Sequence, residues 1–429
     1  MGYLSIEGGA PLRGKVEISG AKNSALKLMA ASLLASGETV LTNVPRISDV
    51  FTMIEVLTRL GAKVSFEGSE LRIDTSGPIS TVAPYDLVRR MRASINVLGP
   101  LLARQGHARV AMPGGCNIGN RTIDIHERSL TQLGVSFTFD HGYLEGIATG
   151  LTGSRVVLDF PSRGATENVL TASVLAKGAT VIENAAREPD ILDLANFLGD
   201  MGAQVFGAGT STIEVVGVSE LVPTSYQVSA DPIEGGTFAL AVLATNGDAE
   251  LLGARPQDME IFLEKLKLAG ARWRETDGGI SVAASGRPAA VDFATLPYPG
   301  FPTDLQPQMM AYLTLADGTS IVTENVFESR FAHVQELVRM GADVRTEGHH
   351  AVIRGVGGLQ GAPVTGSDLR AGAALVVAAL AAEGRSEIHD FHHVQRGYED
   401  FAGKLTALGA RVEIVDSTDK MVLLEASSD

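Results

Sequence analysis

The sequence predicts an α/β protein built from six copies of one supersecondary unit, with three copies in each of two domains. Six times a helix-like run ends around a glycine and passes directly into an apolar strand, and successive glycines lie 68 to 73 residues apart. A period this regular over 429 residues indicates a repeat architecture, so the fold and the functional residues can be interpreted from the repeat. The six glycines are Gly61, Gly134, Gly202, Gly270, Gly341 and Gly409.

A second glycine marks each copy further upstream, where a run rich in alanine and leucine ends before another strand. Glycine just beyond a helix end favours a left-handed cap, because it adopts positive φ without a Cβ clash. We therefore expect left-handed caps at these six positions. They are Gly37, Gly106, Gly178, Gly247, Gly318 and Gly384.

Within a copy, the predicted order is strand, helix, strand, helix and a pair of strands. Alanine-rich helices that alternate with short valine and isoleucine strands favour sheets covered by helices. In the third copy the predicted elements are a strand at 156–160, a helix at 167–178, a strand at 180–184, a helix at 190–202 and a hairpin at 204–217.

Three copies fill residues 20–229 and three fill residues 230–429, which predicts two similar domains with an active site in the cleft between them. The N-terminal segment 3–19 resembles the strand pair that opens other copies. We therefore place residues 1–19 in the second domain, so that two connections join the domains.

Charge and composition limit the possible functions. A net charge of −15 argues against broad binding to nucleic acid or membranes, and no apolar run is long enough for a membrane span. One cysteine excludes an internal disulfide and is typical of a reducing cytoplasm. His392 and His393 lack partners at metal-ligand spacing, so we interpret them as surface residues and predict no metal. The glycines around Cys116 match no phosphate-binding loop of a nucleotide cofactor, and no cofactor is predicted.

Candidate functional residues collect in one loop and at the helix starts. The second copy alone carries an elaborated loop, and this loop contains Cys116. Cys116 in a glycine-rich loop suggests a reactive thiol, whereas a lone cysteine elsewhere is more often a buried small hydrophobic residue.

The predicted helix N-termini, which bind phosphate and carboxylate groups, have cations at or beside them, namely Lys22, Arg92 and Arg370. Each could alternatively be a solvated surface charge, but their equivalent positions in the repeat favour one shared anion site. Arginines also recur in the second loop of the copies, at Arg46, Arg121, Arg187, Arg330 and Arg396.

Eight segments in register resemble the enolpyruvyl transferase family, and within it the branch that acts on UDP-N-acetylglucosamine. The resemblance implies two inside-out α/β barrels with threefold internal symmetry. The segments are SGAKNSA (19–25), MRASINVLGPLLA (91–103), PGGCNIGNR (113–121), NAAREPDI (184–191), FPTDLQ (301–306), ENVFESRF (324–331), DLRAGAALVVA (368–378) and RGYE (396–399).

The same resemblance implies transfer of the enolpyruvyl group of phosphoenolpyruvate to the 3'-hydroxyl of UDP-N-acetylglucosamine, with release of phosphate, in the first committed step of peptidoglycan synthesis. The reaction would proceed by addition and elimination through a tetrahedral ketal, and it requires an acid, a base and cations around the phosphate. By the matching motifs, Cys116 is the general acid and Asp304 the base, while Lys22, Arg121 and Arg396 bind phosphoenolpyruvate. Without the resemblance, Asp304 would be interpreted as a helix N-cap.

The remaining residues that the resemblance assigns to substrate binding support the phosphoenolpyruvate site or contact the UDP-sugar. They are Asn23, Arg92, Thr122, Ile123, Asp124, Ile125, Phe160, Pro161, Ser162, Arg163, Gly164, Val326, Arg330, Asp368 and Arg370.

The chain departs from the family pattern mainly around the nucleotide. Arg163 stands where valine is usual, Thr122 and Pro232 replace a proline and an arginine, and Ser48 replaces a basic residue of some members. Arg163 is expected to bind diphosphate oxygens or to shift the uracil pocket. The alternative is that it points to solvent or pairs with Glu167, one helical turn further on. The alternative functions are transfer to another uridine nucleotide or to shikimate 3-phosphate, whose branch lacks the cysteine loop, and a non-catalytic paralogue that binds UDP-sugars.

Overall fold

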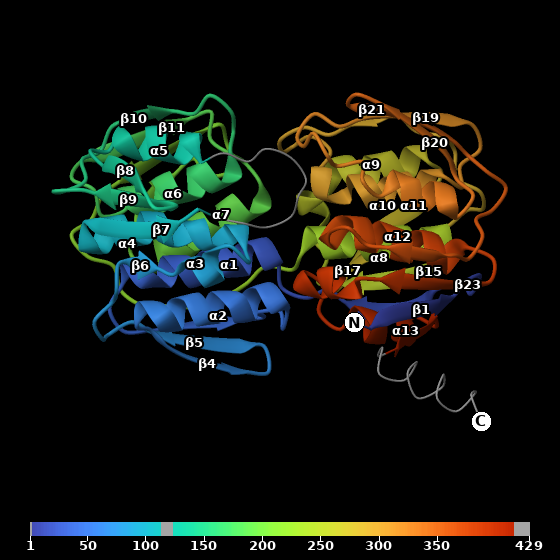
Figure 1. Ribbon diagram of the computed structural model, residues 1–429, viewed down its shortest axis with the longest axis horizontal. Coiled ribbons are helices and arrows are strands. Elements are labelled where there is room, and N and C mark those ends of the chain that lie inside the picture. Colours follow the sequence, from blue (N-terminus) through green and yellow to red (C-terminus); the bar gives the residue numbers. More distant parts are fainter. Residues whose placement is uncertain (1, 113–122, 416–429) are drawn as a thin grey trace. The chain divides into compact units, whose positions relative to one another are not determined.

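The structure is a computed structural model that describes residues 2–112 and 123–415. Its strands form six four-stranded sheets, and each sheet combines one parallel strand pair with two antiparallel pairs (Figure 1). The same pattern recurs in the other four sheets. Six equivalent sheets confirm the predicted α/β fold with six copies of one unit.

The described residues divide into two compact units. The first unit comprises residues 20–112 and 123–229, and the second comprises residues 2–19 and 230–415. Each unit contains its own cluster of buried apolar side chains. Two separate cores mean that each unit can be described as a folded body in its own right.

The first unit contains three sheets, with strand orders β14-β3-β5-β4, β6-β7-β9-β8 and β10-β11-β13-β12. The strands are β3 (Glu38–Thr42), β4 (Lys63–Glu67), β5 (Glu70–Asp74), β6 (Val82–Ala83), β7 (His107–Ala111), β8 (Ser136–Asp140), β9 (Tyr143–Ile147), β10 (Arg155–Val157), β11 (Ala179–Glu183), β12 (Gln204–Phe206), β13 (Thr212–Val216) and β14 (Ser225–Gln227). The helices are α1 (Lys22–Ala31), η1 (Ser32–Leu34), α2 (Ser48–Leu60), α3 (Tyr85–Val88), η2 (Arg92–Val97), α4 (Leu98–Gln105), α5 (Asp124–Thr131), α6 (Arg163–Ser173) and α7 (Pro189–Asp200).

The second unit also contains three sheets, with strand orders β16-β17-β15-β2, β18-β19-β21-β20 and β22-β23-β1-β24. The strands are β1 (Tyr3–Glu7), β2 (Arg13–Glu17), β15 (Asp248–Leu252), β16 (Arg272–Thr276), β17 (Gly279–Ala283), β18 (Phe293–Ala294), β19 (Thr319–Thr323), β20 (Asp343–Glu347), β21 (His350–Arg354), β22 (Pro363–Thr365), β23 (Arg385–His389) and β24 (Arg411–Val415). The helices are α8 (Pro232–Ala244), η3 (Pro256–Asp258), α9 (Glu260–Leu268), η4 (Thr303–Leu305), α10 (Gln306–Leu313), α11 (Val334–Arg339), α12 (Leu369–Ala381), η5 (Phe391–Arg396) and α13 (Phe401–Ala407).

The two strands of the N-terminal segment enter different sheets of the second unit. β1 pairs antiparallel with both β23 and β24, and β2 pairs parallel with β15. Both ends of the described chain therefore contribute strands to the second unit.

The third copy shows how closely the elements follow the sequence pattern. Its strands, helices and hairpin appear in the predicted order, but helix α6 begins at Arg163 rather than at 167. Ser162 is its N-cap, and the Ser162 hydroxyl accepts a hydrogen bond from the backbone N–H of Ala165. Serine is a preferred N-cap residue, so the polar turn 162–166 forms the first turn of the helix.

Five of the six upstream glycines have the predicted positive φ, and Gly247 does not. Only Gly106 is also the left-handed C-cap of a helix, because the C-cap of the preceding helix lies two to four residues earlier at Gly37, Gly178, Gly318 and Gly384. The prediction of left-handed caps is therefore confirmed at Gly106 alone, and at Gly247 the positive φ is wrong as well. There the left-handed residue is Asn246, with φ of 53°. Asparagine tolerates this conformation through its short polar side chain. Gly247 is required for space instead, because a Cβ atom at this position would lie 2.0 Å from the carbonyl oxygen of Leu12.

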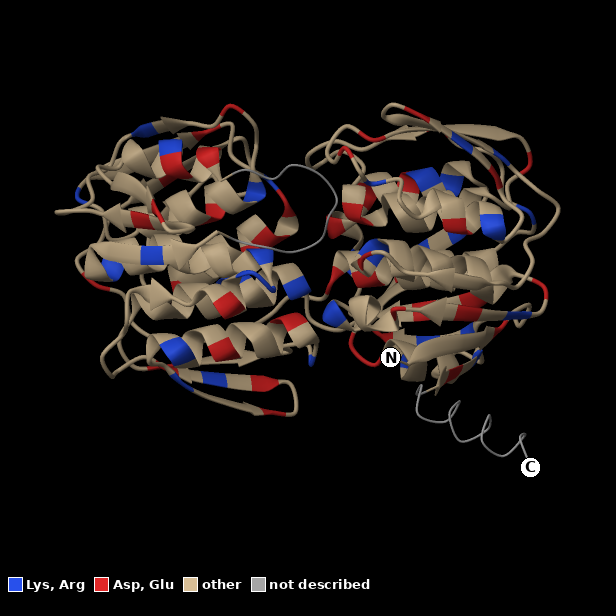
Figure 2. Ribbon diagram, in the orientation of Figure 1, with Lys and Arg blue, Asp and Glu red and all other residues tan. Residues whose placement is uncertain are grey.

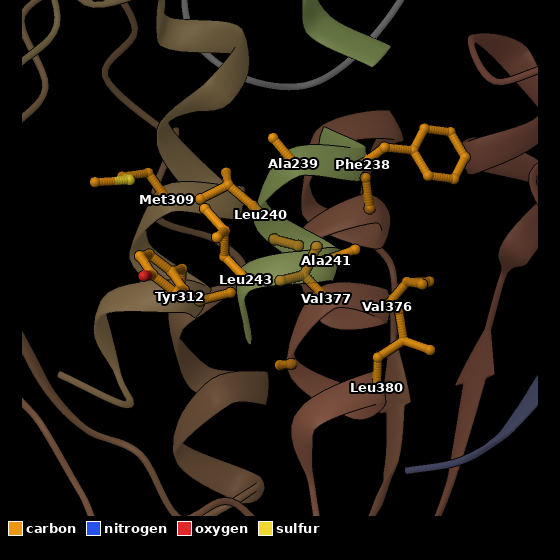
Figure 3. Close-up of a cluster of buried hydrophobic side chains, with 14 of the residues drawn as sticks. Phe238, Ala239, Leu240, Ala241, Leu243, Met309, Tyr312, Val376, Val377 and Leu380 are labelled. Carbon is orange, nitrogen blue, oxygen red and sulfur yellow. The ribbon is translucent and has the colours of Figure 1, made fainter. Parts of the chain in front are cut away.

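The interior of the second unit is formed by α8, α10 and α12, which pack against one another (Figure 1). All eight residues of α10 are buried. The last five residues of α10, Met309 to Leu313, are largely apolar, and its buried polar side chains Gln306 and Gln308 lie in its first turn. A helix buried in this way requires neighbours on every side. Figure 3 shows Leu240 and Leu243 of α8 beside Tyr312 of α10 and Val377 of α12 in this core.

Charged residues are scarce along these inner helices. α10 contains none, α8 contains only Glu234 and α12 only Arg370, and both lie in the first turn of their helix (Figure 2). Burial removes charges from the helix middle, because an unpaired charge there is costly. Polar chemistry in the second unit is therefore concentrated at the helix starts.

Candidate active site

In the second unit, the carboxylate of Asp304 lies between two buried arginines. Asp304 Oδ1 is 2.8 Å from Arg330 Nη2, and Asp304 Oδ2 is 3.1 Å from Arg370 Nη2. The arginine side chains are only 3% and 4% exposed, whereas the carboxylate side chain is 26% exposed. The cluster therefore presents its carboxylate to solvent and keeps its cations behind it.

The two arginines are held in place by neutral partners as well as by Asp304. Arg330 donates to the carbonyl oxygen of Thr303, and Arg370 donates to the hydroxyl of Tyr398. Burial opposes the charged form of Arg370, but Asp304 holds the pKa of its guanidinium above the ordinary value. Arg330 and Arg370 carry two positive charges and Asp304 carries one negative charge. The three side chains therefore have a net charge of +1, which suits an anionic ligand.

The N-cap interpretation of Asp304 is wrong, because its side chain forms ion pairs rather than a cap. Thr303, Asp304 and Leu305 form the short helix η4, whose N-cap is Pro302. A different aspartate is an N-cap in this unit. Asp368 caps α12, and its Oδ1 accepts from the backbone N–H groups of Arg370 and Ala371 at 2.9 and 3.2 Å. Asp368 thereby fixes the start of α12 and the origin of the Arg370 side chain.

Glu324 organises the loop that contains Val326, and sequence reasoning did not single it out. Its Oε1 accepts from the backbone N–H of Val326 at 2.8 Å and from the hydroxyl of Thr295 at 2.8 Å. Its Oε2 accepts from the hydroxyl of Thr303, next to Asp304. The signal available in the sequence was an acidic residue at the start of the segment ENVFESRF.

Arg396, another predicted site residue of the second unit, is the last residue of η5, which packs on α12.

In the first unit, the predicted cations Lys22 and Arg92 each open a helix. Lys22 is the first residue of α1, and its Nζ is 3.0 Å from Asp49 Oδ2 in the first turn of α2. Asn23 follows in the same turn of α1. Arg92 opens the 3-10 helix η2. The prediction that these cations lie at helix starts is therefore confirmed.

Arg163 pairs with acids of the 188–190 turn. Its Nη2 is 3.6 Å from Glu188 Oε1, and its Nε is 3.7 Å from Asp190 Oδ2. Glu167, the expected alternative partner, instead pairs with the buried Lys27 at 2.6 Å. The predicted ion pair with Glu167 is wrong, because Glu167 points to the inner side of α6, toward α1.

Lys27 lies at the centre of this buried cluster. It pairs with Glu167 and with Asp190, and Asn96 Nδ2 donates to the other oxygen of Glu167 at 2.8 Å. Burial lowers the pKa of Lys27 to about 8, although Glu167 favours its charged form. Ion pairs thus join the starts of α6 and α7 to α1. They are formed by Lys27, Glu167, Asp190 and Arg163.

His126 brings two of the predicted nucleotide-binding segments together. Its ring lies against Gly164, where an added Cβ would meet His126 Cε1 at 3.0 Å. Its Nδ1 is 3.0 Å from Nδ2 of Asn168 in α6. Burial, and next the charge of Arg92, lower the pKa of His126 to about 4, so the ring is neutral at pH 7. The start of α5 and the start of α6 are thus adjacent.

The predicted residues of these segments occupy the two helix starts. Ile123 precedes α5 and is buried, and Phe160 is 43% exposed. Asp124 accepts a hydrogen bond from Arg128 one turn further on. Asp124 and Ile125 begin α5, whereas Phe160, Pro161, Ser162, Arg163 and Gly164 lead into α6.

The contacts of the described residues thus gather predicted site residues into two groups, one in each unit. Cys116, Arg121 and Thr122 lie outside the described residues.

Two other departures from the family pattern fall at helix starts. Pro232 is the first residue of α8, after the N-cap Asp231, and proline favours this position. Ser48 is the first residue of α2.

Residues 2–112 and 123–415 contain neither a group of potential metal ligands nor a helix suited to crossing a membrane. In this part of the chain, no three His, Cys, Asp or Glu side chains come close enough together to ligate a metal ion. None of its helices combines the length and the apolarity that a membrane crossing requires.

Comparison with known proteins gives one family and many near-full-length relatives. Residues 6–405 match the family model described as EPSP synthase (3-phosphoshikimate 1-carboxyvinyltransferase). A UDP-N-acetylglucosamine 1-carboxyvinyltransferase of Corynebacterium jeikeium is 52% identical over 410 residues, which cover 96% of this chain and 98% of the relative. The protein of the same name from Thermotoga maritima is 49% identical over 418 residues, which cover 97% and 99% of the two chains.

Solved structures show the same fold. The enolpyruvyl transferase NikO from Streptomyces tendae superimposes with a TM-score of 0.86 at 25% identity, over 96% of this chain and 99% of NikO. An EPSP synthase from Acinetobacter baumannii superimposes with a TM-score of 0.76 at 19% identity, over 97% of this chain and 100% of the other.

Proposed function

The chain belongs to the enolpyruvyl transferase family that the EPSP synthase model describes, and we propose that it transfers the enolpyruvyl group of phosphoenolpyruvate to the 3'-hydroxyl of UDP-N-acetylglucosamine. Phosphate is released, and the product is the first committed precursor of peptidoglycan. The observation that carries this function is identity of about half the residues, over nearly the full length of both chains, to relatives named for this reaction. The group around Asp304 supports it, because it offers a carboxylate and cationic groups at one place.

Asp304 is proposed to take the proton of the sugar hydroxyl. A general base must be ionised and accessible to the reacting hydroxyl. Arg330 and Arg370 stabilise the anionic carboxylate, and its partial exposure leaves it accessible. The hydroxyl oxygen then bonds to C2 of the enolpyruvyl group, while the methylene carbon receives a proton.

Cys116 is proposed to supply that proton. A thiol with a pKa near 8.5 is mostly protonated at neutral pH, as a proton donor must be. The resulting tetrahedral ketal loses a proton from its methyl carbon and expels phosphate, which restores the double bond. Lys22, Arg121 and Arg396 are proposed to bind the phosphate and carboxylate of phosphoenolpyruvate, because cations stabilise the charge of the leaving group. This arrangement would be supported by Asn23, Arg92, Arg330, Asp368 and Arg370.

The nucleotide is proposed to bind the adjacent starts of α5 and α6. Residues 121–125 and 160–164, with Val326, are the proposed contacts. Backbone N–H groups at the start of α6 are donors suited to a diphosphate. The guanidinium of Arg163 instead lies near Glu188 and Asp190. The prediction that residues of both units form one active site remains part of this proposal.

We also propose that the protein acts in the cytoplasm, as its single cysteine suggests, and that fosfomycin inactivates it by alkylating Cys116. Its product would then supply the cell-wall synthesis on which cell shape and division depend.

The decisive experiment measures phosphate release from phosphoenolpyruvate with UDP-N-acetylglucosamine, another uridine nucleotide sugar and shikimate 3-phosphate as separate acceptors. We expect release with UDP-N-acetylglucosamine and an enolpyruvyl ether as the product by mass spectrometry. A preference for another acceptor would identify the alternative transferase. Tight binding of the UDP-sugar without any release would identify a non-catalytic paralogue.

The role of Cys116 has its own test. Cys116→Ala should abolish turnover while the affinity for the UDP-sugar stays within about threefold, because the thiol acts in the proton step. Cys116→Asp should retain turnover and resist fosfomycin, since a carboxylic acid can also donate a proton. Full turnover of the alanine variant would remove Cys116 from the mechanism.

A further inference from the structure

Tyr398 is a buried residue whose hydroxyl joins the three inner helices of the second unit. It is 2% exposed and follows Arg396 by two positions. Its hydroxyl oxygen lies 2.8 Å from Thr237 Oγ1 of α8, 3.2 Å from Gln308 Nε2 of α10 and 3.2 Å from Arg370 Nη1 of α12. Thr237 and Gln308 are themselves fully buried.

The direction of these hydrogen bonds follows from the available protons. The single hydroxyl proton of Thr237 is donated to the carbonyl oxygen of Ile233 at 2.8 Å. Thr237 can therefore only accept from Tyr398, and the tyrosine oxygen accepts from Gln308 and Arg370. Burial raises the pKa of Tyr398, so the hydroxyl keeps the proton that this arrangement requires.

The network ends at the proposed base. Arg370 uses Nη1 for Tyr398 and Nη2 for Asp304. A guanidinium is planar and rigid, so fixing one of its nitrogens fixes the other. The position of the Tyr398 hydroxyl thus determines where Arg370 meets the partly exposed carboxylate.

We propose that Tyr398 is a positioning residue for the reaction: it acts through Arg370 to hold the carboxylate of Asp304 in its productive orientation. This inference rests on the proposed function, in which Asp304 accepts the proton of the sugar hydroxyl. It also explains why a tyrosine stands at this position. Phenylalanine could keep the ring contact with Phe401, whose centroid is 4.7 Å away, but it would leave buried donors of Arg370 and Gln308 without this acceptor.

The test uses Tyr398→Phe, with Tyr312→Phe as its matched control. Tyr312 is also 2% exposed, and it lies in the apolar core of the same unit (Figure 3). We expect kcat of Tyr398→Phe to fall roughly tenfold or more, as for the loss of a hydrogen bond to a charged group. KM for phosphoenolpyruvate should stay within about twofold, and Tyr312→Phe should keep the turnover of the unsubstituted protein.

A second background separates positioning from general stability. In an Asp304→Asn protein, adding Tyr398→Phe should not lower the residual kcat further, because both changes remove the same interaction. An equal fractional loss in both backgrounds, or a kcat of Tyr398→Phe within twofold of Tyr312→Phe, would overturn the proposal. The absence of turnover in the unsubstituted protein would refute the proposed function instead.

Thr237→Val provides a further variant if Tyr398→Phe does not fold. It removes the acceptor of the tyrosine hydroxyl and leaves the ring and Arg370 in place. We expect a fall in kcat of about threefold or more, consistent with loss of a neutral hydrogen bond. Unchanged turnover in folded Thr237→Val would contradict the proposal.

Discussion

The two units contain clusters of charged side chains with opposite charge arrangements. In the second unit, one carboxylate, Asp304, lies between Arg330 and Arg370. In the first unit, one buried ammonium group, Lys27, lies between Glu167 and Asp190. The same supersecondary unit thus supports a cation-rich group in one case and an acid-rich group in the other.

The difference lies in exposure as well as in sign. The second-unit carboxylate is 26% exposed, whereas the side chains of Lys27, Glu167 and Asp190 are all less than 10% exposed. A buried and internally paired cluster mainly fixes the packing of helices, and a partly exposed group with excess charge can bind a ligand. The comparison therefore predicts effects on stability in the first unit and on turnover in the second.

The largest effect is expected from Lys27→Met. It would leave Glu167 and Asp190 buried beside one another without their shared cation, and breaking such a pair costs about 3–5 kcal/mol of unfolding free energy. Urea denaturation followed by circular dichroism measures this loss. Lys177→Met, at an exposed lysine of the same unit, is the control. A loss below about 1 kcal/mol would show that the cluster does not depend on Lys27.

A pH effect should appear in both units, because each contains a buried neutral histidine. Burial is the main cause that lowers the pKa of His126 and of His333 to about 4. The unfolded value is near 6.5, so the unfolded chain binds more protons at acidic pH. The stabilisation is present above pH 6.5 and is lost as the pH falls to 4, by about 3 kcal/mol for each histidine.

The two histidines can be distinguished by their partners. His333 Nδ1 donates to the carbonyl oxygen of Arg330, whereas His126 Nδ1 accepts from Asn168, so the rings are opposite tautomers. His126→Gln and His333→Gln should each weaken the pH dependence of the unfolding free energy. Fluorescence of Trp273, the only tryptophan, monitors the second unit. An unchanged pH dependence in either variant would assign the acid sensitivity to other groups.

A somewhat smaller effect is expected on catalysis from Asp304→Asn. The amide cannot accept the hydroxyl proton, so kcat should fall by about a hundredfold or more, equivalent to about 2.7 kcal/mol. Steady-state kinetics measures the change, and Asp317→Asn, whose side chain is 83% exposed, is the control. A kcat within tenfold of the unsubstituted protein would exclude Asp304 as the base.

The smallest effect is expected from Arg163→Val. The Arg163 side chain is 35% exposed and its guanidinium already lies near Glu188 and Asp190, so its removal should change the unfolding free energy by less than about 1 kcal/mol. The affinity for the UDP-sugar should change by less than about threefold, because the charge is already compensated. Calorimetric titration decides the question. A tenfold loss of affinity would show that Arg163 leaves its acids to bind the diphosphate.

Much of the fold could be predicted from the sequence because it depends on local sterics. The period of 68 to 73 residues defines the copies, and the repeated glycines adopt positive φ at Gly61, Gly134 and their counterparts. Gly247 is the instructive exception. Only the approach of the Leu12 backbone, far away in sequence, shows why glycine is needed there.

The sequence motifs also indicated which polar residues belong to the candidate site, but not how they pair. Asp304 and Arg370 are 66 positions apart, and Thr237 and Tyr398 are 161 apart. Glu167 was expected to pair with Arg163 on its own helix, yet it pairs with Lys27 of α1.

The sequence by itself thus determined the repeat, the elements within it and the helix starts at which charge collects. These depend on backbone conformations that each residue type favours with its immediate neighbours. Only the tertiary structure decided which acidic side chain pairs with which basic side chain. Burial makes an unpaired charge costly, so each buried charge must pair with a distant residue that the packed helices bring beside it.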